Sequence, residues 1–266
     1  MIGAGAFTRT AACLALIGAP QWIQAQSAEE LAKQLANPVA ALISVPFQLN
    51  YDDNIGIGDE GSRWTMNVQP VIPMDLSDDW NLISRTILPV VSADNIPAGA
   101  GRETGLGDTV QSLFFSPKAT TAGGWIWGAG PVFLLPTSSD RTLGLGEWGG
   151  GLTAVALKQS GSWTYGGLTN HIWEWTGDVD VSQTFLQPFL SFTTANAWTF
   201  ALNTESTYDW EADQWTVPIN AIATKVTTFG DQLVSIGGGI RYYADSPNGG
   251  AEGWGGRLVL TLLFPK

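Results

Sequence analysis

Residues 42–52 read LISVPFQLNYD, and apolar and polar side chains alternate along this stretch. The apolar members are Ile43, Val45, Phe47, Leu49 and Tyr51, and the polar members are Ser44, Gln48, Asn50 and Asp52. Successive side chains of a β-strand point to opposite faces. The stretch therefore predicts a long strand with one apolar and one polar face, and this pattern decides the fold class.

Strands of the same kind recur along the chain. Alternation is equally regular in residues 64–75, 198–209 and 215–225. Less regular candidates occupy residues 80–91, 108–118, 124–135, 148–159, 163–173, 183–194, 232–243 and 255–264. The total is about twelve strands of roughly 10–12 residues, close to the length of a tilted membrane-spanning strand and longer than the usual soluble strand.

The connections between these strands alternate in length. Long ones cover residues 52–62, 92–106, 136–147, 174–182 and 244–254, with residues 210–214 as a shorter member of this series, and tight ones cover residues 76–79, 119–123, 160–162, 195–197 and 227–231. Long loops on one side and short turns on the other are typical of single-chain outer-membrane barrels. The sequence therefore predicts an all-β fold, a single transmembrane antiparallel β-barrel of about twelve strands over residues 38–266.

Residues 1–25 have the features of a secretory signal peptide. Arg9 precedes an apolar run, residues 11–19, that is too short to span a bilayer, and Ile23-Gln24-Ala25 offers a cleavage site. The single cysteine, Cys13, lies in this segment, so cleavage would leave no disulfide and no thiolate metal site. A buried N-terminal helix and a lipoprotein signal are the alternatives. We expect export to the outer membrane with cleavage near Ala25.

Residues 26–37 follow as a short periplasmic segment that contains one helix. Ser27 is a suitable N-cap, Glu30 completes a capping box for a helix over residues 27–36, and Asn37-Pro38 ends it. This helix is expected either to cap or plug the periplasmic mouth of the barrel or to serve as a simple tether.

The composition favours a membrane environment and argues against a nucleic-acid partner. The chain carries 12 Lys+Arg against 24 Asp+Glu, a net charge of -12 that repels polyanions. Charged residues make up only 14% of the chain and Trp occurs 13 times, as expected for a protein with aromatic belts at membrane interfaces. Acidic residues gather in the long loops, whereas Lys118, Lys158, Lys225 and Lys266 lie at the opposite ends. We therefore expect contact with lipid and, through divalent cations, with lipopolysaccharide.

The last strand carries a local signal. Leu258, Leu260, Leu262 and Phe264 alternate with Arg257, Val259, Thr261 and Leu263. A terminal strand that ends in Phe resembles the assembly signal of outer-membrane proteins, although Pro265 and Lys266 follow the aromatic residue here. The resemblance implies the barrel-assembly machinery as a partner. The alternative is the last strand of a soluble barrel.

Several segments together resemble a known family. They are residues 67–73 (NVQPVIP), 80–85 (WNLISR), 125–131 (WIWGAGP), 183–189 (QTFLQPF) and 203–210 (NTESTYDW). The chain is similar to bacterial outer-membrane proteins labelled "transporter" or "neuromedin U", which group with barrels of the phenol meta-pathway type. The likeness covers roughly residues 28–266. It implies a β-barrel in the outer membrane and implies neither a substrate nor a catalytic set.

The polar faces of the strands supply the candidate site. If the apolar faces meet lipid, the polar faces line the lumen, since a charge facing lipid at mid-depth costs about 2–4 kcal/mol for Arg or Lys. The expected lumen-lining residues are Gln48, Asn50, Asn67, Gln69, Arg85, Asn203, Glu205, Asp209, Asn220, Arg241 and Arg257. Arginines opposed to carboxylates across a lumen could set a transverse field that selects polar solutes. Salt bridges that fill a closed lumen are the alternative.

No constellation of catalytic or metal-binding residues is evident. His171 is the single histidine, and Trp173 stands where a hydrolase of the outer-membrane phospholipase type would need Ser. His171 is expected to be a strand-end or lumenal polar residue. Glycines 149–151 and 237–239 are expected to permit bending or close strand approach, because no helix follows them as in a phosphate-binding loop. No cofactor, metal or enzymatic activity is expected.

The leading functional hypothesis is passive diffusion of small polar or amphipathic solutes through an outer-membrane channel. A closed barrel with a structural or adhesion role is the second hypothesis. An outer-membrane lipid hydrolase is the third, and a soluble lipocalin-like binder, with its apolar face inward, is the fourth. The transported solute, pore diameter and oligomeric state do not follow from the sequence.

Overall fold

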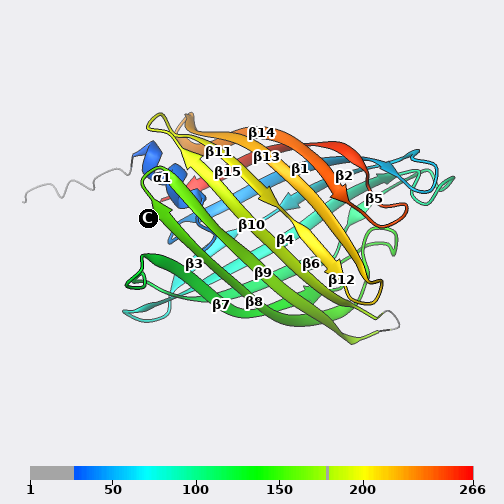
Figure 1. The fold of residues 1–266 in the computed structure, drawn as a ribbon, viewed down its shortest axis with the longest axis horizontal. Coiled ribbons are helices and arrows are strands. Elements are labelled where there is room, and N and C mark those ends of the chain that lie inside the picture. The colour runs from blue at the N-terminus through cyan, green and yellow to red at the C-terminus, as the bar shows by residue number, and fades with distance from the viewer. Residues whose placement is uncertain (1–26, 178–179, 266) are drawn as a thin grey trace, which may run out of the picture.

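The structure is a computed structural model that describes residues 27–177 and 180–265. The expected signal segment, residues 1–25 with Cys13, lies outside the described residues, as do Asp178, Val179 and Lys266. The described residues form one short helix and a closed antiparallel β-barrel with strongly tilted strands (Figure 1). This architecture confirms the predicted fold class.

The helix α1 spans Ala28–Leu35. The strands are β1 (Ile43–Ile55), β2 (Gly61–Val68), β3 (Val71–Asp75), β4 (Trp80–Asp94), β5 (Arg102–Leu106), β6 (Thr109–Pro117), β7 (Trp125–Leu135), β8 (Trp148–Ser160), β9 (Trp163–Thr176), β10 (Ser182–Thr193), β11 (Trp198–Thr204), β12 (Ser206–Asp209), β13 (Gln214–Phe229), β14 (Gln232–Asp245) and β15 (Gly253–Phe264). Consecutive segments pair with each other except at β2–β3, β5–β6 and β11–β12, and β1 pairs with β15 to close the ring.

The fifteen described segments make twelve barrel strands, because three strands are interrupted. β2 continues into β3, β5 into β6 and β11 into β12, each against the same neighbouring strand. The break between β11 and β12 falls at Glu205, which lies opposite Pro218 of β13, and Pro188 of β10 lies opposite the preceding Thr204. Proline has no N–H to donate, so the ladder is weakened there. The prediction of about twelve strands is confirmed.

One predicted loop contains a strand that the sequence did not reveal. Residues 92–106 were expected to be a long connection, but Arg102–Leu106 pairs with the end of β4 as β5. β4 runs on to Asp94, and Arg102 forms an ion pair with Asp94 at 2.6 Å. Thr104 and Gly105 interrupt any apolar alternation in β5, so its sequence alone does not indicate a strand. The segment becomes a strand because it pairs with the extended end of β4, a tertiary contact that sequence periodicity does not detect.

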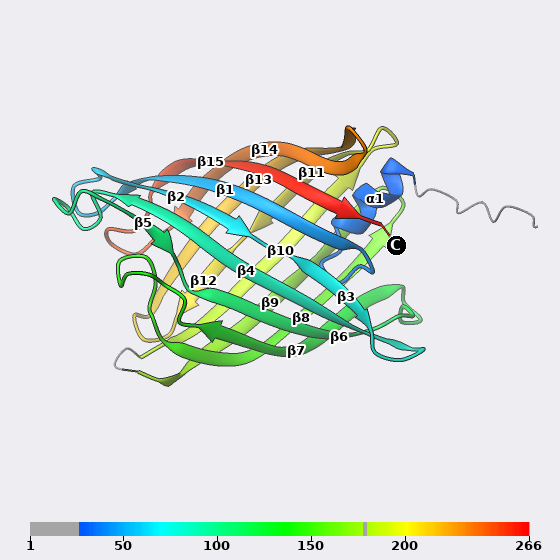
Figure 2. The ribbon, with the colours of Figure 1, turned by 180° about the vertical axis from the view of Figure 1, so that it is seen from behind.

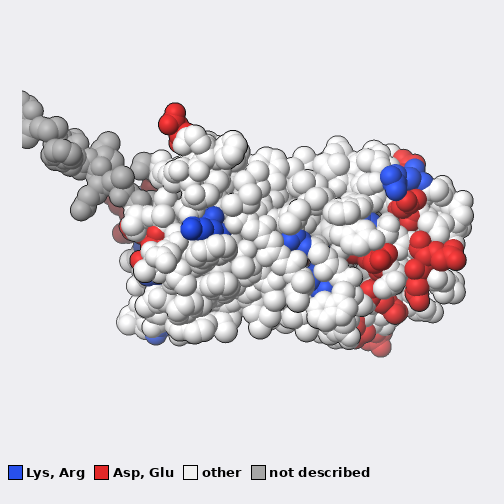
Figure 3. All heavy atoms as spheres, turned by 90° about the horizontal axis from the view of Figure 1, so that it is seen from above, with Lys and Arg blue, Asp and Glu red and all other residues white. Residues whose placement is uncertain are grey.

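The two ends of the barrel differ. The long loops lie at one end, here called the loop end, and α1 lies with the C-terminal strand end and the tight turns at the other, the helix end (Figures 1 and 2). Carboxylates gather at the loop end, whereas uncharged atoms dominate the middle of the wall (Figure 3). Lys118, Lys158 and Lys225 lie at the helix end, next to the tight turns. The charge segregation seen in the sequence is thus a difference between the two ends.

The apolar faces of the strands point outward. Phe200 on β11, Ile240 on β14 and Leu258 on β15 are 51%, 54% and 62% exposed. This orientation contradicts the soluble lipocalin-like hypothesis, which requires these faces to be inside. A wall with large apolar side chains over so many strands is unfavourable in water and matches a membrane-embedded surface.

Exposed tryptophans form two levels around the wall. The helix-end level holds Trp80, Trp125, Trp127, Trp163 and Trp198, and the loop-end level holds Trp64, Trp148, Trp173, Trp175, Trp210, Trp215 and Trp254. Trp163 and Trp173 lie on the same face of β9. At about 3.3 Å per residue and a tilt of about 40°, they are roughly 25 Å apart along the barrel axis, the height of the apolar band of membrane barrels.

Leu258→Arg tests the lipid-facing wall. The arginine would meet hydrocarbon near mid-depth, so we expect the free energy of unfolding from lipid vesicles to fall by about 2–4 kcal/mol. Urea titration of the vesicle-inserted protein measures this change. Ile57→Arg is the matched control, because Ile57 is 95% exposed in a loop-end turn and the variant should unfold like the parent. Equal losses in both variants would contradict a lipid-facing position for Leu258.

Candidate lumenal site

The N-terminal helix closes part of the helix end. Ser27 caps α1 by accepting a hydrogen bond from the backbone N–H of Glu30, as the sequence predicts. The apolar side of α1 buries Leu31 and Ala32 against Val226 and Leu263 on the inner wall. Gln159 of β8 donates a hydrogen bond to the carbonyl of Lys33 at 2.8 Å. No helix in the described part of the chain is long and apolar enough to cross a membrane.

The segment after α1 reaches into the lumen. Val39 is 4% exposed and belongs to a buried cluster on the inner wall. The other members of this lumenal apolar cluster are Ile83, Phe114, Val155, Leu157 and Leu168, which come from β4, β6, β8 and β9. The inner faces of these strands are mixed, with polar side chains such as Arg85 and Thr153 beside the apolar cluster, so the expected polar inner face is only partly present. The apolar positions pack against the N-terminal segment rather than against water.

An ion pair crosses the remaining part of the lumen. Both carboxylate oxygens of Glu205 accept hydrogen bonds from the Arg257 guanidinium, at 2.8 and 2.6 Å. Arg257 also donates from Nε to Asn50 Oδ1 at 2.7 Å, and its side chain is 1% exposed. Glu205 follows β11 and Arg257 lies on β15, with β13 and β14 between them in the wall. The pair therefore spans a chord of the barrel.

A second charged group lies nearer the loop end. The side chain of Asp52 is 3% exposed. Its Oδ1 lies 3.5 Å from Arg241 Nη1, and its Oδ2 lies 3.8 Å from Arg63 Nη2. Asn220 donates to Asn203 at 2.9 Å on the neighbouring inner wall. Asp52 Oδ1, Arg63 Nε, Arg241 Nε and Asn220 Oδ1 are nevertheless buried without a hydrogen-bond partner among the described residues, so charge attraction rather than hydrogen bonding joins Asp52 to its arginines.

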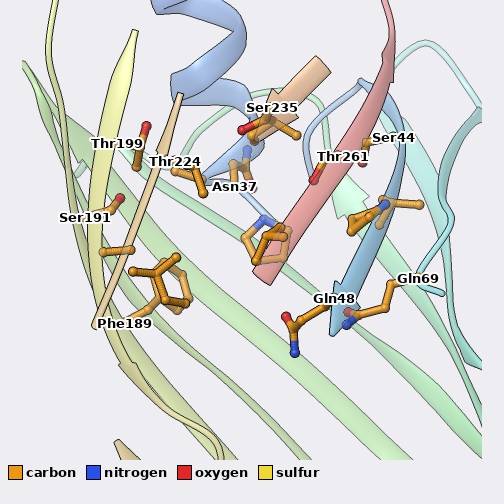
Figure 4. A pocket seen from close by; sticks show the side chains of 18 of the residues that line it. Asn37, Ser44, Gln48, Gln69, Phe189, Ser191, Thr199, Thr224, Ser235 and Thr261 are labelled. Carbon is orange, nitrogen blue, oxygen red and sulfur yellow. The ribbon is translucent and has the colours of Figure 1, made fainter. Parts of the chain in front are cut away.

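Two cavities lie on either side of the Glu205–Arg257 pair. The helix-end cavity has a volume of about 410 Å³ and the loop-end cavity about 350 Å³, and both are lined by Asn67 and Glu205. In the helix-end cavity, Gln48 and Gln69 lie on one side, whereas Phe189 and Ser191 lie on the other (Figure 4). These two cavities, here called chambers, thus share the Glu205 carboxylate in their linings.

The structure places the eleven sequence-predicted residues as follows. Gln48, Gln69, Arg85, Asn203 and Arg257 line the helix-end cavity, Asn50 and Arg241 line the loop-end cavity, and Asn67 and Glu205 line both. Asn220 is buried beside Asn203. Asp209 lies apart from both cavities, at the loop-end tip of β12, where Gln183 donates to its carboxylate at 3.0 Å.

The residues that line the cavities differ in charge from the rest of the chain. Their arginines are Arg63, Arg85, Arg241 and Arg257, and their carboxylates are Asp52, Asp108 and Glu205. The lining has a formal excess of one positive charge, whereas the whole chain carries -12. Asp52, Arg63 and Asp108 were absent from the predicted lumen-lining set. Each lies at the first or last residue of a predicted strand or one position beside it, so following the alternation to the strand ends could have included them.

A loop-end connection folds over the loop-end cavity. Thr142 and Leu143, in the connection between β7 and β8, line this cavity, and Leu143 packs with Val91 and Ala93 of β4. The carboxylate of Asp108 accepts backbone hydrogen bonds from Ser138, Leu145 and Gly146. Three N–H donors on one carboxylate hold the connection in place.

Asp108→Ala should release this connection. Loss of the charge-assisted acceptor leaves its backbone donors without that partner, so we expect limited trypsin digestion after Arg141 to become several times faster. Gel densitometry of the membrane-inserted protein measures the rate. Asp59→Ala, in another loop-end turn, serves as control and should be cleaved like the parent. An unchanged rate in Asp108→Ala would show that the connection is held by other contacts.

His171 does not lie in the lumen. It pairs opposite Leu152 and Thr184 on the outward face of β9, and its Nδ1 is 2.7 Å from the Thr184 hydroxyl. The rings of Trp173 and Trp210 lie beside it. The prediction that His171 is lumenal is therefore wrong. His171 lies toward the loop end of β9, near the loop-end level of tryptophans.

The glycines of β14 are required where they stand. Gly237 and Gly239 face inward, and a Cβ on either would overlap the carbonyl oxygen of Ala223 or Ala221 on β13. The strands β13 and β14 therefore approach closely on the inner side, as the sequence predicts for these glycines.

Comparisons with known proteins agree with the architecture. No family model matches the chain, and no curated protein matches its sequence. An outer-membrane channel from Pseudomonas putida F1 superposes with a TM-score of 0.64 at 17% identity, over 84% of this chain and 94% of that one. The NanC porin has a TM-score of 0.49 at 10% identity, over 84% of this chain and 100% of that one. The chain has the fold of a bacterial outer-membrane β-barrel.

Proposed function

We propose that the protein is an outer-membrane channel through which small polar or amphipathic solutes diffuse passively. The observation that carries the proposal is the pair of cavities that meet at Glu205 and Asn67 inside a closed barrel with an apolar outer wall. A barrel of this strand number is wide enough to enclose space beyond its own side chains. The similar fold of a channel protein supports the same reading. The proposal assigns no chemical reaction to the protein.

The orientation follows from the difference between the ends. Membrane barrels have short turns in the periplasm and long loops outside. In this arrangement α1 and the lysine-bearing end face the periplasm, and the acidic loops face outward toward lipopolysaccharide. The chain would reach this place by export, removal of residues 1–25 and insertion by the barrel-assembly machinery.

Solute flux into liposomes tests the proposal. Vesicles containing the protein are diluted into isotonic solutions of glycerol, erythritol, glucose and sucrose, and the swelling rate is followed by light scattering. We expect swelling that slows as the solute grows, because the chambers have volumes of only about 410 and 350 Å³. Vesicles containing protein but showing the swelling rate of empty vesicles for every solute would overturn the proposal.

A closed structural or adhesion barrel is the second candidate. The Glu205–Arg257 pair and the lumenal apolar cluster favour it, because both fill space that a wide pore would leave open. Swelling distinguishes the two candidates. A closed barrel gives no flux for glycerol, and it also gives none when Glu205 is replaced by Ala.

A further inference from the structure

We infer that the helix-end cavity binds a small amphipathic carboxylate, whose acid group Arg85 holds. The inference rests on the proposed passage of solutes through this lumen, and it names the class of solute that the helix-end cavity favours.

Arg85 differs from the other cavity-lining arginines in its partners. Its guanidinium donates one hydrogen bond, to Gln69 Oε1 at 3.1 Å. Among the described residues no carboxylate oxygen lies within 4.0 Å of Arg85, whereas Arg257, Arg241 and Arg63 each have one. A guanidinium has five N–H donors in a planar fork. Most donors of Arg85 are thus available to a ligand in the cavity that it lines.

The carboxylate of Glu205 also lines this cavity, but it does not form an ion pair with Arg85. Glu205 uses both oxygens on Arg257. Arg85, Arg257 and Glu205 are the charged side chains among the residues that line the helix-end cavity, so the lining has a formal excess of one positive charge. A ligand with a single negative charge therefore neutralises the cavity.

The rest of the lining specifies an apolar group beside that charge. Phe185 and Phe189 of β10 line the cavity together with Ile87 and Ile222. Arg85 stands between the inward side chains of Ile83 and Ile87 along β4. An inorganic anion would leave this apolar surface without contacts. A carboxylate attached to an aromatic or short aliphatic group would contact both Arg85 and the apolar side chains. The volume of about 410 Å³ is in the range of small-molecule sites.

Equilibrium dialysis of the full barrel in detergent with radiolabelled benzoate tests the inference. We expect saturable binding, competed by unlabelled benzoate and not by benzyl alcohol, which has the ring without the charge. Arg85→Met keeps an unbranched chain and removes the guanidinium, so affinity should fall about ten- to hundred-fold. Arg102→Met removes an exposed loop-end arginine and should bind like the parent. Equal competition by benzyl alcohol, or full affinity in Arg85→Met, would overturn the inference.

Two further measurements keep the outcomes distinct. Heat-modifiable gel mobility shows whether Arg85→Met is folded, and if it is not, Arg85→Lys replaces it and should lose most of the affinity because ammonium lacks the planar fork. Competition by chloride and phosphate at the same concentration as benzoate would show a general anion site and sink the amphipathic specificity. Benzoate binding in a barrel that shows no liposome flux would overturn the proposed channel and leave the site, whereas flux without binding would overturn the site alone.

Discussion

Glu205→Ala is expected to lower the free energy of unfolding by about 3–5 kcal/mol and to shift ion selectivity strongly toward anions. Arg257 would remain 1% exposed without a carboxylate, and an unpaired buried charge has a cost of this size. The variant also changes the formal charge of the cavity lining from an excess of one to an excess of two positive charges. Urea titration gives the stability, and the reversal potential in a salt gradient gives the selectivity.

The double variant Glu205→Ala/Arg257→Met separates the two effects. Removing both charges should recover most of the lost stability, because Arg257 is no longer left as a buried ion without its carboxylate. It should also return the selectivity toward that of the parent, since the net charge of the lining is restored. Glu103→Ala in β5, an exposed carboxylate outside the cavities, is the control for a simple loss of negative charge. Equal selectivity in Glu205→Ala and the parent would contradict the lumenal position of Glu205.

Val39→Asp is expected to raise single-channel conductance several-fold. The carboxylate would lie among Ile83, Phe114 and Leu168, where it has no partner, so the N-terminal segment should leave the lumen. Its departure opens the part of the cross-section that the segment fills. Step amplitudes in a planar bilayer measure the change.

Ser27→Ala is the matched control for the N-terminal segment. It removes the N-cap of α1, at a cost of about 1 kcal/mol, and leaves the contacts of Val39 in place. Its conductance should equal that of the parent. If Val39→Asp also conducts like the parent while remaining folded, the segment does not restrict the lumen.

The outer wall was predictable because one face of each strand meets the membrane wherever the strand lies in the barrel. β1 and β15 show this most clearly, since Leu49 and Leu258 pair on the outward face and Asn50 and Arg257 on the inward face, as the alternation predicts. β4, β6, β8 and β9 were less regular. Several of their inner side chains form a cluster with Val39, which is distant in sequence, so no local pattern could show why apolar residues also occupy the inner face.

The sequence could predict most of the residues that line the candidate site, but not which of them contact one another. Alternation identified Arg257 and Glu205 as inward residues, but it did not indicate that they meet across β13 and β14. That contact passes over two intervening strands, so it depends on the curvature of the barrel. The position of Asp108 beneath the connection after β7 is likewise a tertiary feature, set by backbone N–H groups that carry no side-chain signal.

Single-channel recording of the wild-type protein in a planar lipid bilayer tests the central claim most directly. We expect stable current steps with a linear dependence on voltage, because ions pass through the two chambers that meet at Glu205. Bilayers that contain correctly folded barrels, as judged by heat-modifiable mobility, but show no steps above the baseline would contradict it.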